Sequence, residues 1–214
     1  NGYKEIVLTG INIGNYLCPQ TGADLAALTQ DIFEVEGNFR IRFSSIEINT
    51  VTDKLIEVLS RGWQKACNYL HLPLQSGSDA VLKHMKRRYT TKEYHERVTY
   101  IKSKIDGLAV FCDIIAGYPT ETEEDFEITK NFLKQIGFAG LNVFSYSVRP
   151  GTPAAALPQI SAQEIKRRSD ELRALDKELR SAFAAKLVGT TQDFLAEEVL
   201  KNGSVSGVLA NFAR

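Results

Sequence analysis

Short apolar runs alternate along the chain with longer stretches of helical periodicity. Apolar runs of strand length lie at about 5–9, 40–48, 68–74, 108–117 and 140–148. Between them lie stretches in which apolar residues recur every three or four positions, as in amphipathic helices: 24–36, 52–61, 78–86, 91–105 and 122–136. Strand followed by helix, repeated, predicts a parallel sheet with right-handed crossovers. Five such units are too few for a closed eight-fold barrel, so we expect an α/β fold with an open, partial parallel βα barrel.

The pattern changes after residue 150. Prolines mark a loop, and residues 161–187 then form one long helical pattern, whose charged run Lys166-Arg167-Arg168 is expected on a solvated face. Two strand patterns, at 190–199 and 204–209, flank a turn. We therefore expect a partial barrel at 1–160, a connecting helix at 161–188 and the start of a small, truncated β module at 189–214. Both ends of the sequence suggest a fragment of a longer protein.

Polar residues or glycines follow each of the five strand-length runs. The five segments are Leu8-Thr9-Gly10-Ile11-Asn12, Phe43-Ser44-Ser45-Ile46-Glu47, Leu70-His71-Leu72-Pro73-Leu74-Gln75-Ser76-Gly77, Asp113-Ile114-Ile115-Ala116-Gly117-Tyr118-Pro119 and Phe144-Ser145-Tyr146-Ser147-Val148-Arg149-Pro150-Gly151. Because parallel strands bring their carboxyl ends to one edge, these segments predict one arc of loops around one ligand. The chain is therefore expected to be enzyme-like.

Glycines punctuate two of these loops. Gly10 lets the backbone approach a ligand, and Asn12 beside it is able to accept a hydrogen bond from an ammonium group. A plain βα turn is the alternative. Gly117 allows a similar approach, and the helix after it offers free N–H groups and a partial positive charge. The alternative for Glu121, Glu123 and Glu124 is a structural role, in which they complement that helix dipole.

The second segment places a carboxylate at a strand end. Ser45 and Glu47 alternate on one face of the predicted strand. A carboxylate near a buried strand end needs a partner, and a cationic ligand would supply one. A salt bridge to Arg42 or Lys54 is the alternative.

The third segment carries groups that suit a nucleoside. His71 and Gln75 flank a proline and are able to hydrogen-bond ribose hydroxyls or a base edge. A histidine satisfied within the core is the alternative. The continuation Gln75-Ser76-Gly77-Ser78-Asp79 favours the ligand, because it adds polar groups at the same strand end.

Charge limits the partners. The 26 basic residues balance the 26 acidic ones, which argues against nucleic-acid binding by bulk electrostatics. The one clear basic cluster, Lys83, Lys86, Arg87 and Arg88, either contacts RNA phosphates or complements a helix C-terminus. Arg149 places a further cation at the mouth of the last loop, and an ordinary proline- and glycine-rich turn is the alternative there.

Cysteine usage and hydropathy suggest a cytoplasmic protein. Cys18, Cys67 and Cys112 lack the close spacing of zinc or iron–sulfur loops, so three reduced thiols are expected. The sequence has no apolar run of roughly 18 residues and does not open with a signal peptide. We therefore expect no membrane association.

Together these motifs resemble the radical S-adenosylmethionine (SAM) methylthiotransferases. The resemblance rests on the five segments above, on Val81-Leu82-Lys83-His84-Met85-Lys86-Arg87, on Glu121-Thr122-Glu123-Glu124-Asp125-Phe126 and on Arg149-Pro150-Gly151-Thr152-Pro153-Ala154. It extends to about residue 188, and the tail resembles the opening of the family's small RNA-binding β-barrel module. The resemblance implies a radical SAM barrel that adds a methylthio group to an unactivated C–H bond.

The implied substrate is a modified adenosine beside the tRNA anticodon. The Ser44-Ser45-Ile46-Glu47 form is most similar to the branch that acts on N6-threonylcarbamoyladenosine in the anticodon loop. Four alternatives stay open: an isopentenyladenosine enzyme, an enzyme for a ribosomal protein aspartate, another radical SAM enzyme such as a porphyrin oxidase relative, and a non-catalytic RNA-binding remnant. The sulfur donor is not indicated.

The resemblance also implies contacts with SAM. Those contacts are Thr9, Gly10 and Asn12 at the methionine end; Ser45 and Glu47 at the floor, near the ammonium or sulfonium; His71, Gln75 and Ser76 at the ribose; Ala116, Gly117, Tyr118 and Pro119 at the adenine; and Arg149, with Lys86, Arg87 and Arg88, on the substrate side.

One departure from the family is large. The family's CxxxCxxC loop, which holds a [4Fe–4S] cluster, would precede residue 1, and the three cysteines present cannot replace it. We therefore expect that this chain ligates no metal, that it is inactive alone and that it binds SAM weakly without the cluster. A smaller departure is Pro119-Thr120-Glu121-Thr122, where the family has Pro-Gly-Glu-Thr.

Overall fold

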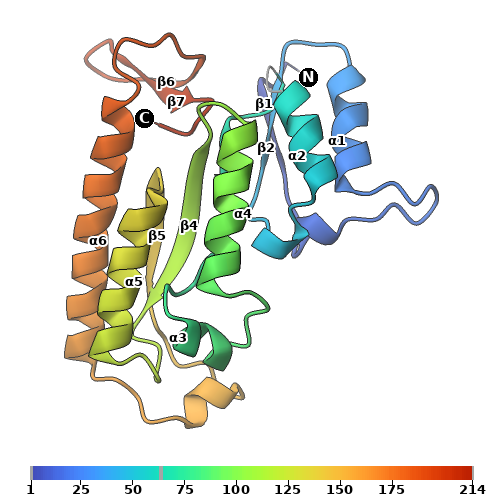
Figure 1. Ribbon diagram of the computed structural model, residues 1–214. Helices are drawn as coiled ribbons and strands as arrows, with labels where there is room; N and C mark the ends of the chain where they lie inside the picture. The colour runs from blue at the N-terminus through green and yellow to red at the C-terminus, as the bar shows by residue number, and fades with distance from the viewer. Residues whose placement is uncertain (1, 63–64, 214) are drawn as a thin grey trace. The chain divides into compact units, whose positions relative to one another are not determined.

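A computed structural model describes residues 2–62 and 65–213 of the chain (Figure 1). The residues cluster into two compact units. Unit 1 comprises Asn1–Leu72, Thr99–Val110 and Leu187–Arg214, and unit 2 comprises Pro73–Val98 and Phe111–Lys186. Each unit therefore combines segments that are far apart in the sequence.

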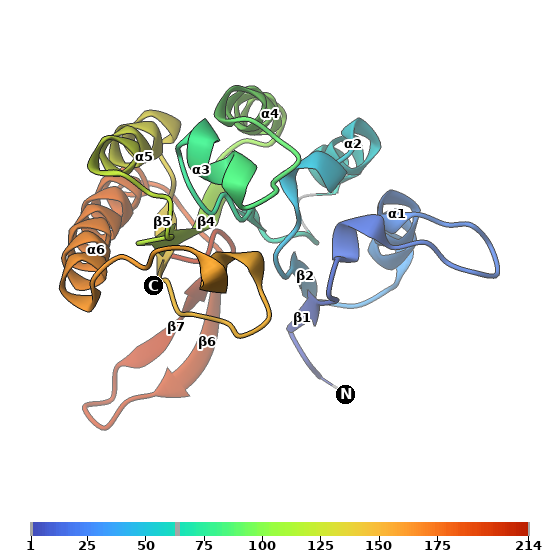
Figure 2. The same ribbon diagram turned by 90° about the horizontal axis from the view of Figure 1, so that it is seen from below.

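Unit 1 contains a parallel pair of strands, two helices that each follow one of these strands in the sequence, and an antiparallel hairpin. Its elements are β1 (Glu5–Leu8), α1 (Leu25–Glu34), β2 (Arg40–Phe43), α2 (Asp53–Arg61), β3 (Tyr69–His71), β6 (Phe194–Val199) and β7 (Val205–Leu209), with short 3₁₀ helices at Ile13–Asn15 and Ile48–Thr50. β1 and β2 pair in parallel from Glu5 opposite Arg40 to Leu8 opposite Phe43. α1 and α2 lie side by side (Figure 2).

Unit 2 contains the second parallel pair. Its elements are α3 (Asp79–His84), most of α4 (Thr91–Lys104), most of β4 (Ala109–Ala116), α5 (Glu123–Ile136), β5 (Gly140–Ser145), a 3₁₀ turn (Pro153–Ala156) and α6 (Ala162–Ala185). β4 and β5 pair in parallel from Phe111 opposite Gly140 to Ala116 opposite Ser145. α5 and α6 run side by side, and α6 packs along β5 (Figures 1 and 2). Parallel strands in sheets that do not close confirm the predicted open α/β fold.

The helices begin where the sequence places capping residues. The side chains of Thr52, Ser78 and Ser161 each accept a hydrogen bond from a first-turn N–H of α2, α3 and α6. At α5, the Thr122 hydroxyl accepts from the Asp125 N–H at 3.1 Å, and the Asp125 carboxylate accepts from the Thr122 N–H at 3.0 Å. This reciprocal pair is a capping box with Asp in place of the usual Glu or Gln.

The apolar runs form the interior of each unit. In unit 1, the side chains at most 2% exposed include Ile41, Ile46, Leu55, Ile56 and Leu70. In unit 2, the side chains buried to the same degree include Leu74, Leu82, Tyr94, Ile114, Phe126, Leu133 and Phe138. Burying one such side chain stabilises the fold by about 1.5–3 kcal/mol. These residues hold the strands whose carboxyl ends carry the predicted site.

Two strands are shorter than their apolar runs predict. β2 ends at Phe43, so Ser45 and Glu47 lie beyond the strand rather than on one of its faces. The reason is local: the N–H of Ile46 donates to the carbonyl of His71 at 2.9 Å, and a 3₁₀ turn follows Glu47. β3 likewise covers only Tyr69–His71 of the run at 68–74. Ile46 is buried and its neighbours Ser45 and Glu47 are more exposed, as the predicted alternation requires, but these residues form a loop rather than a strand.

One predicted solvated face is wrong in part. Lys166 and Arg167 are exposed, but Arg168 is only 5% exposed and Ser169 is fully buried. They share the buried stripe of α6 with Leu172. The run of charges predicts a solvent-exposed face because the sequence pattern does not reveal that Glu121 and Glu123 pair with Arg168.

Side chains of α6 satisfy backbone groups of β5. The Leu141 N–H donates to Asp176 at 2.6 Å, and the Leu141 carbonyl accepts from Arg180 at 3.3 Å. Unsatisfied strand edges invite unwanted pairing, so α6 protects this one. No helix within residues 2–62 and 65–213 is both long and apolar enough to cross a membrane.

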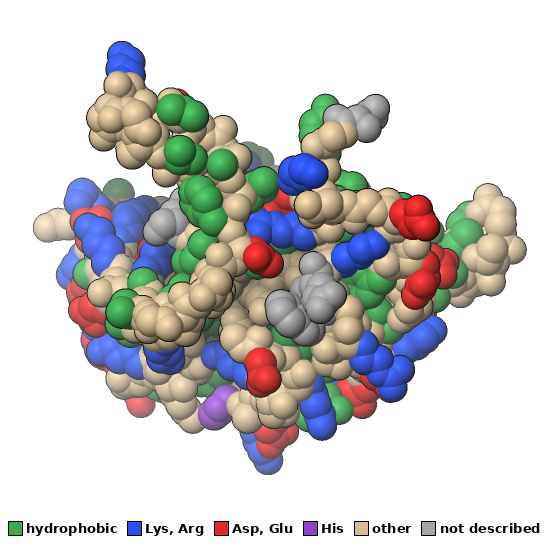
Figure 3. Space-filling model, turned by 90° about the horizontal axis from the view of Figure 1, so that it is seen from above, with side chains coloured by type: hydrophobic (Ala, Val, Ile, Leu, Met, Phe, Trp, Pro, Cys, Tyr) green, Lys and Arg blue, Asp and Glu red, His purple; other side chains and the backbone are tan. Residues whose placement is uncertain are grey.

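The β6–β7 hairpin is tied to β2 and β3 within unit 1. Arg40 donates to the Val208 carbonyl at 3.2 Å, the Arg42 guanidinium lies 4.6 Å from the centre of the Phe212 ring, and that ring lies 4.8 Å from Tyr69. Hydrophobic side chains run along the hairpin, which projects at the upper left of Figure 3. Phe194 and Val199 are 51% and 72% exposed.

Candidate cofactor-binding site

Three polar strand ends meet at one edge of unit 1. The Ser44 N–H donates to the Leu8 carbonyl at 2.9 Å, so β1 and β2 end at the same level. The Ile46 N–H donates to the His71 carbonyl, also at 2.9 Å, which brings the end of β3 to the same edge. Thr9, Gly10, Asn12 and Ser45 are exposed there or half-buried, and so are Glu47 and His71.

The alternative partners of Glu47 are engaged elsewhere. Arg42 pairs with Glu5 at 2.8 Å, and Lys54 pairs with Asp24 at 3.1 Å. The carbonyl of Glu47 accepts hydrogen bonds from the Thr50 N–H at 2.9 Å and from the Thr50 hydroxyl at 2.7 Å. These bonds fix the backbone at the predicted floor of the site.

The loop after β1 packs closely against this turn, and a glycine at position 14 leaves the space that this contact needs. A Cβ on Gly14 would lie 1.9 Å from the Thr50 hydroxyl oxygen and 2.6 Å from its Cβ. By contrast, a Cβ on Gly10 would meet only ordinary contacts, the nearest at 3.8 Å, to Ile13. Gly14 is therefore required by packing within the chain, whereas the packing places no such demand on Gly10.

The other predicted strand ends meet within unit 2. The Gln75 N–H donates to the Asp113 carbonyl at 2.8 Å, and the Gln75 carbonyl accepts from Ile115 at 3.0 Å, so this segment pairs with β4. The Tyr146 N–H donates to the Ala116 carbonyl at 2.8 Å beyond β5. Gln75 has a φ of 73°, in the left-handed region that few residues other than glycine occupy. Such strain is common at ligand-binding positions.

The turn after β4 is built around Gly117. This glycine has a φ of 79°, and its N–H donates to a carboxylate oxygen of Glu121 at 2.9 Å. The Tyr118 ring packs edge-on against Tyr146, with 5.6 Å between ring centroids, and its hydroxyl donates to the His84 carbonyl at 3.4 Å. Burial raises the pKa of Tyr118, so this hydroxyl stays protonated as a donor.

Sequence reasoning missed the partner of Glu121. Arg168 of α6 donates to the Glu121 carboxylate at 2.9 Å and to the Glu121 carbonyl at 2.8 Å. Burial raises the pKa of Glu121, and the hydrogen bonds from Arg168 and Gly117 oppose that rise without cancelling it. The available signal was spacing, because Arg168, Leu172 and Leu175 fall on one helical stripe.

The expected role of Glu121 in the helix dipole is therefore wrong. The residue precedes α5, and its side chain turns back to the loop and to α6. Glu123 lies in the first turn of α5, where a carboxylate complements the dipole as expected.

The remaining predicted contacts differ in how accessible they are. Ser76 is 1% exposed, and its hydroxyl lies 3.4 Å from the Thr129 hydroxyl and accepts from the Ser78 N–H at 3.2 Å. A role for this hydroxyl at a ribose would require it to change partners. Four cations are assigned to the substrate side. Lys86, Arg88 and Arg149 are exposed, and Arg87 is half-buried. Their roles at the substrate stay predictions.

Buried polar atoms at these strand ends suit a polar ligand. The hydroxyls of Ser44, Thr120 and Tyr146 are buried and have no hydrogen-bond partner among the described residues. Native proteins rarely leave such atoms unsatisfied unless water or a ligand completes them. Ser44 follows β2 in unit 1, and the other two follow β4 and β5 in unit 2. An ordered water or a polar ligand would complete these hydroxyls.

The residues present do not fit an iron–sulfur cluster. The three cysteines are free thiols, as predicted. Burial raises the pKa of Cys67 to about 12 and raises that of Cys112, so neither is poised to become a thiolate ligand. Among residues 2–62 and 65–213, no group of three or more Cys, His, Asp or Glu side chains is arranged to hold a metal.

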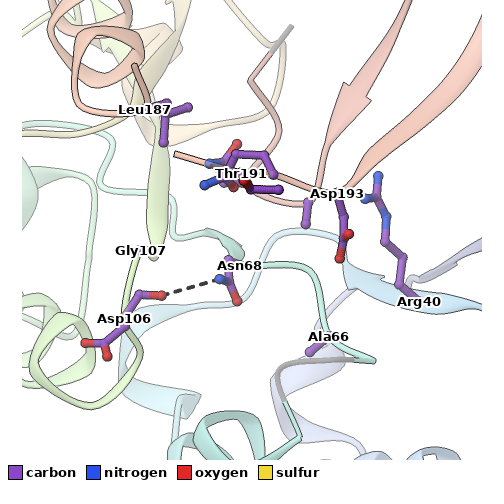
Figure 4. Close-up of a pocket in the computed structure, with 11 residues that line it drawn as sticks. Arg40, Ala66, Asn68, Asp106, Gly107, Leu187, Thr191 and Asp193 are labelled. Carbon is purple, nitrogen blue, oxygen red and sulfur yellow. Dashed lines mark hydrogen bonds between the residues drawn. The ribbon is translucent and has the colours of Figure 1, made fainter. Parts of the chain in front are cut away.

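A cavity of about 380 Å³ lies elsewhere in unit 1 (Figure 4). It is lined by Arg40, Asn68, Asp106, Asp193 and Asn211 among others, and Asn68 donates to the Asp106 carbonyl at 3.3 Å. Arg40 opens β2 and Asn68 directly precedes β3, so the cavity lies at the amino ends of these strands. Ligands of parallel α/β sheets bind at the carboxyl ends, which separates this cavity from the candidate site.

Named proteins share much of this sequence. A threonylcarbamoyladenosine tRNA methylthiotransferase (MtaB) of Bacillus subtilis is 44% identical over 202 residues, covering 94% of this chain and 45% of the relative. The enzyme of the same name from Thermotoga maritima is 35% identical, covering 96% and 47%. A tRNA-2-methylthio-N(6)-dimethylallyladenosine synthase of Thermodesulfovibrio yellowstonii is 37% identical, also covering 96% and 47%. The chain thus spans about half the length of these relatives.

Solved structures share the fold at low identity. The coproporphyrinogen III oxidase HemN of Escherichia coli superposes with a TM-score of 0.57 at 18% identity, over 72% of this chain and 36% of that one. The radical SAM methyltransferase TsrM of Kitasatospora setae gives 0.55 at 13%, over 71% and 29%. Residues 1–133, which carry four of the five polar strand ends, match the radical SAM superfamily. The chain therefore belongs to the radical SAM superfamily.

Proposed function

We propose that this chain is the core of a tRNA methylthiotransferase that acts on N6-threonylcarbamoyladenosine next to the anticodon. The observation that carries the proposal is 44% identity, over 94% of the chain, to a relative named for that activity. The clustering of polar strand ends within each unit supports a cofactor site in the part of the chain that matches.

SAM is the proposed cofactor, and it would supply the radical chemistry for which the superfamily is named. In unit 1, Glu47 and the polar groups of Thr9, Asn12 and Ser45 would accept hydrogen bonds from its ammonium group or offset its positive charge. In unit 2, the Gly117 turn would contact the adenine, with Tyr118 and Tyr146 forming an apolar and polar wall beside it. Ligands for a [4Fe–4S] cluster would come from a part of the whole protein outside this 214-residue chain.

The substrate could instead be the dimethylallyl form of adenosine. Three relatives named for that substrate are 35–40% identical to the chain, and the two named for threonylcarbamoyladenosine are 44% and 35% identical. The Ser44-Ser45-Ile46-Glu47 form and the 44% match favour threonylcarbamoyladenosine. A ribosomal protein substrate has no comparable support among these relatives.

Nucleoside analysis tests the proposal. The whole protein that carries this chain is reconstituted anaerobically with iron and sulfide, then incubated with SAM, reductant, a sulfide source and tRNA. Three tRNA substrates are compared: one bearing threonylcarbamoyladenosine, one bearing dimethylallyladenosine and one unmodified. Mass spectrometry of digested nucleosides is expected to show a methylthio product from the first alone.

The outcomes separate the alternatives. Formation of product from the tRNA that bears dimethylallyladenosine would assign dimethylallyladenosine as the substrate instead. Absence of product from every tRNA, by a protein with a complete cluster, would overturn the methylthiotransferase proposal. The 214-residue chain alone serves as the negative control and is expected to yield no product, because its three cysteines are dispersed and it offers no cluster ligand set in its described residues.

A further inference from the structure

The buried ion pair of unit 2 lies directly behind the turn proposed to contact adenine. The side chains of Glu121 and Arg168 are 1% and 6% exposed and lie 2.9 Å apart. Glu121 also accepts the N–H of Gly117, the residue at which the turn leaves β4. One carboxylate therefore joins the turn to α6.

The guanidinium of Arg168 is engaged on every edge. Its Nη1 donates to the carboxylate and to the carbonyl of Glu121, its Nε donates to Glu164 at 2.9 Å, and its Nη2 donates to Glu123 at 3.1 Å. Its face lies over the ring of Phe126, 5.4 Å from the centroid. Contacts this numerous fix the position of the guanidinium and, through it, the position of Glu121.

Stability alone does not account for such a pair. Removing two charges from water is costly, and replacing a buried pair with apolar groups of similar size is often neutral or stabilising. Three carboxylates, those of Glu121, Glu123 and Glu164, converge on Arg168. The pair does, however, restrict the backbone between Gly117 and Glu121, where the turn also packs against Ile165 of α6.

We propose that Arg168 is a positioning residue that acts through Glu121 to hold the turn at residues 117–119 in the geometry that binds the adenosyl part of SAM. This inference rests on the proposed function for the identity of the ligand. It assigns a role in cofactor binding to a residue on α6, outside residues 1–133 that match the superfamily.

The test compares three variants of the reconstituted whole protein. Arg168→Met removes the guanidinium but keeps the length of the side chain, Glu121→Gln removes the charge, and the double variant removes both charges together. For each, thermal stability is measured alongside the Kd for SAM by equilibrium dialysis. The KM for SAM and kcat are measured where turnover is detected.

Positioning predicts a specific pattern. Each single variant is expected to raise the Kd and KM for SAM by about tenfold or more, with kcat at saturating SAM close to that of the wild type. The double variant is expected to recover the stability lost by the single variants, because no unpaired charge stays buried, while its Kd for SAM remains raised.

Arg167→Met is the matched control. Arg167 is the next residue on α6, pairs with Glu123, Glu164 and Glu171, and its side chain is 41% exposed. Its removal is expected to change neither the Kd nor the thermal midpoint appreciably.

Three results would overturn the inference: a wild-type Kd in the single variants, recovery of the Kd together with stability in the double variant, or an equal effect of Arg167→Met. Binding of SAM is measured without tRNA, so failure of the positioning role is distinguishable from failure of the methylthiotransferase proposal. If the wild-type protein binds SAM but modifies no tRNA, the methylthiotransferase proposal fails, and the positioning role of Arg168 is still tested by the Kd values.

Discussion

Gly117 and Ile165 approach so closely that a Cβ on the glycine would lie 2.5 Å from Cγ1 of the isoleucine. The glycine also has a φ of 79°, which disfavours any side chain. Two independent constraints therefore require glycine at the point where the chain leaves β4 and enters the candidate site.

Gly117→Ala is expected to destabilise the protein by about 2–4 kcal/mol, the sum of a backbone strain and an overpacking penalty. It is also expected to weaken SAM binding, because the turn must shift to relieve the contact. Thermal melting and equilibrium dialysis measure the two effects.

Gly137→Ala is the control for backbone strain. Gly137 has a φ of 64° at the end of α5, but a Cβ there would meet nothing within 4 Å. We expect a loss of only about 1 kcal/mol and unchanged SAM binding. Equal losses in the two alanine variants would mean that the contact with Ile165 is relieved without penalty.

The glycines after β1 are expected to separate packing from ligand binding. Gly14→Ala is expected to destabilise by about 1–3 kcal/mol, because its Cβ would overlap Thr50. Gly10→Ala is expected to leave stability nearly unchanged, because its Cβ would meet only ordinary contacts, and to raise the Kd for SAM, because the predicted close approach there is to the ligand. If Gly10→Ala binds SAM like the wild type, the predicted contact at Gly10 is wrong.

Glu5 predicts part of the acid sensitivity of unit 1. Burial would raise the pKa of Glu5, but hydrogen bonds from Arg42 and Arg40 outweigh it and leave the pKa below the ordinary 4.5. A carboxylate with a lowered folded pKa contributes stability that is complete above its unfolded pKa and is lost as the pH falls through the folded one. Stability should therefore decrease as the pH drops below about 4.5.

Glu5→Gln tests this dependence. The variant is expected to be less stable by roughly 1–3 kcal/mol at neutral pH and to lose less stability on acidification than the wild type. Thermal midpoints between about pH 3 and pH 7 measure both, with Glu57→Gln at the exposed pair with Arg61 as the control. Parallel pH profiles for wild type and Glu5→Gln would contradict the assignment.

The basic cluster at the end of α3 is expected to contact tRNA phosphates. Replacing Lys86 and Arg88 with Gln should weaken tRNA binding and reduce the slope of log K against log salt by roughly 1–2. Filter binding at several salt concentrations measures the slope. Lys92→Gln, at an exposed lysine on α4 that pairs with Glu96, is the control. An unchanged slope in the double variant would mean that the cluster only complements the C-terminus of α3 and does not contact phosphates.

Local chemistry made much of the fold predictable. Strand and helix periods differ clearly, and capping side chains such as Thr52, Ser78 and Thr122 mark the helix starts within a residue. Within each unit, neighbouring polar strand ends could be assigned to one edge because parallel strands bring their carboxyl ends to the same side. Strand lengths were harder, since Ile46 is buried like a strand residue but lies in a loop.

The candidate site was predictable as a set of loops but not as a network. Sequence spacing alone does not reveal that Ser76 turns its hydroxyl toward Thr129, or that Arg42 is committed to Glu5. Both depend on which side chains other segments bring alongside, tens of residues away in the chain.

By itself, the sequence determined the order of elements, the positions of the polar strand ends and the superfamily, because these follow from local periodicity and from motif residues. Only the tertiary structure decided the fate of Arg168, which looks like part of a solvated charge run and is instead buried against Glu121. The physical reason is that burial of a charge depends on its partners, and the partners Glu121 and Glu123 are separated from it by 47 and 45 residues.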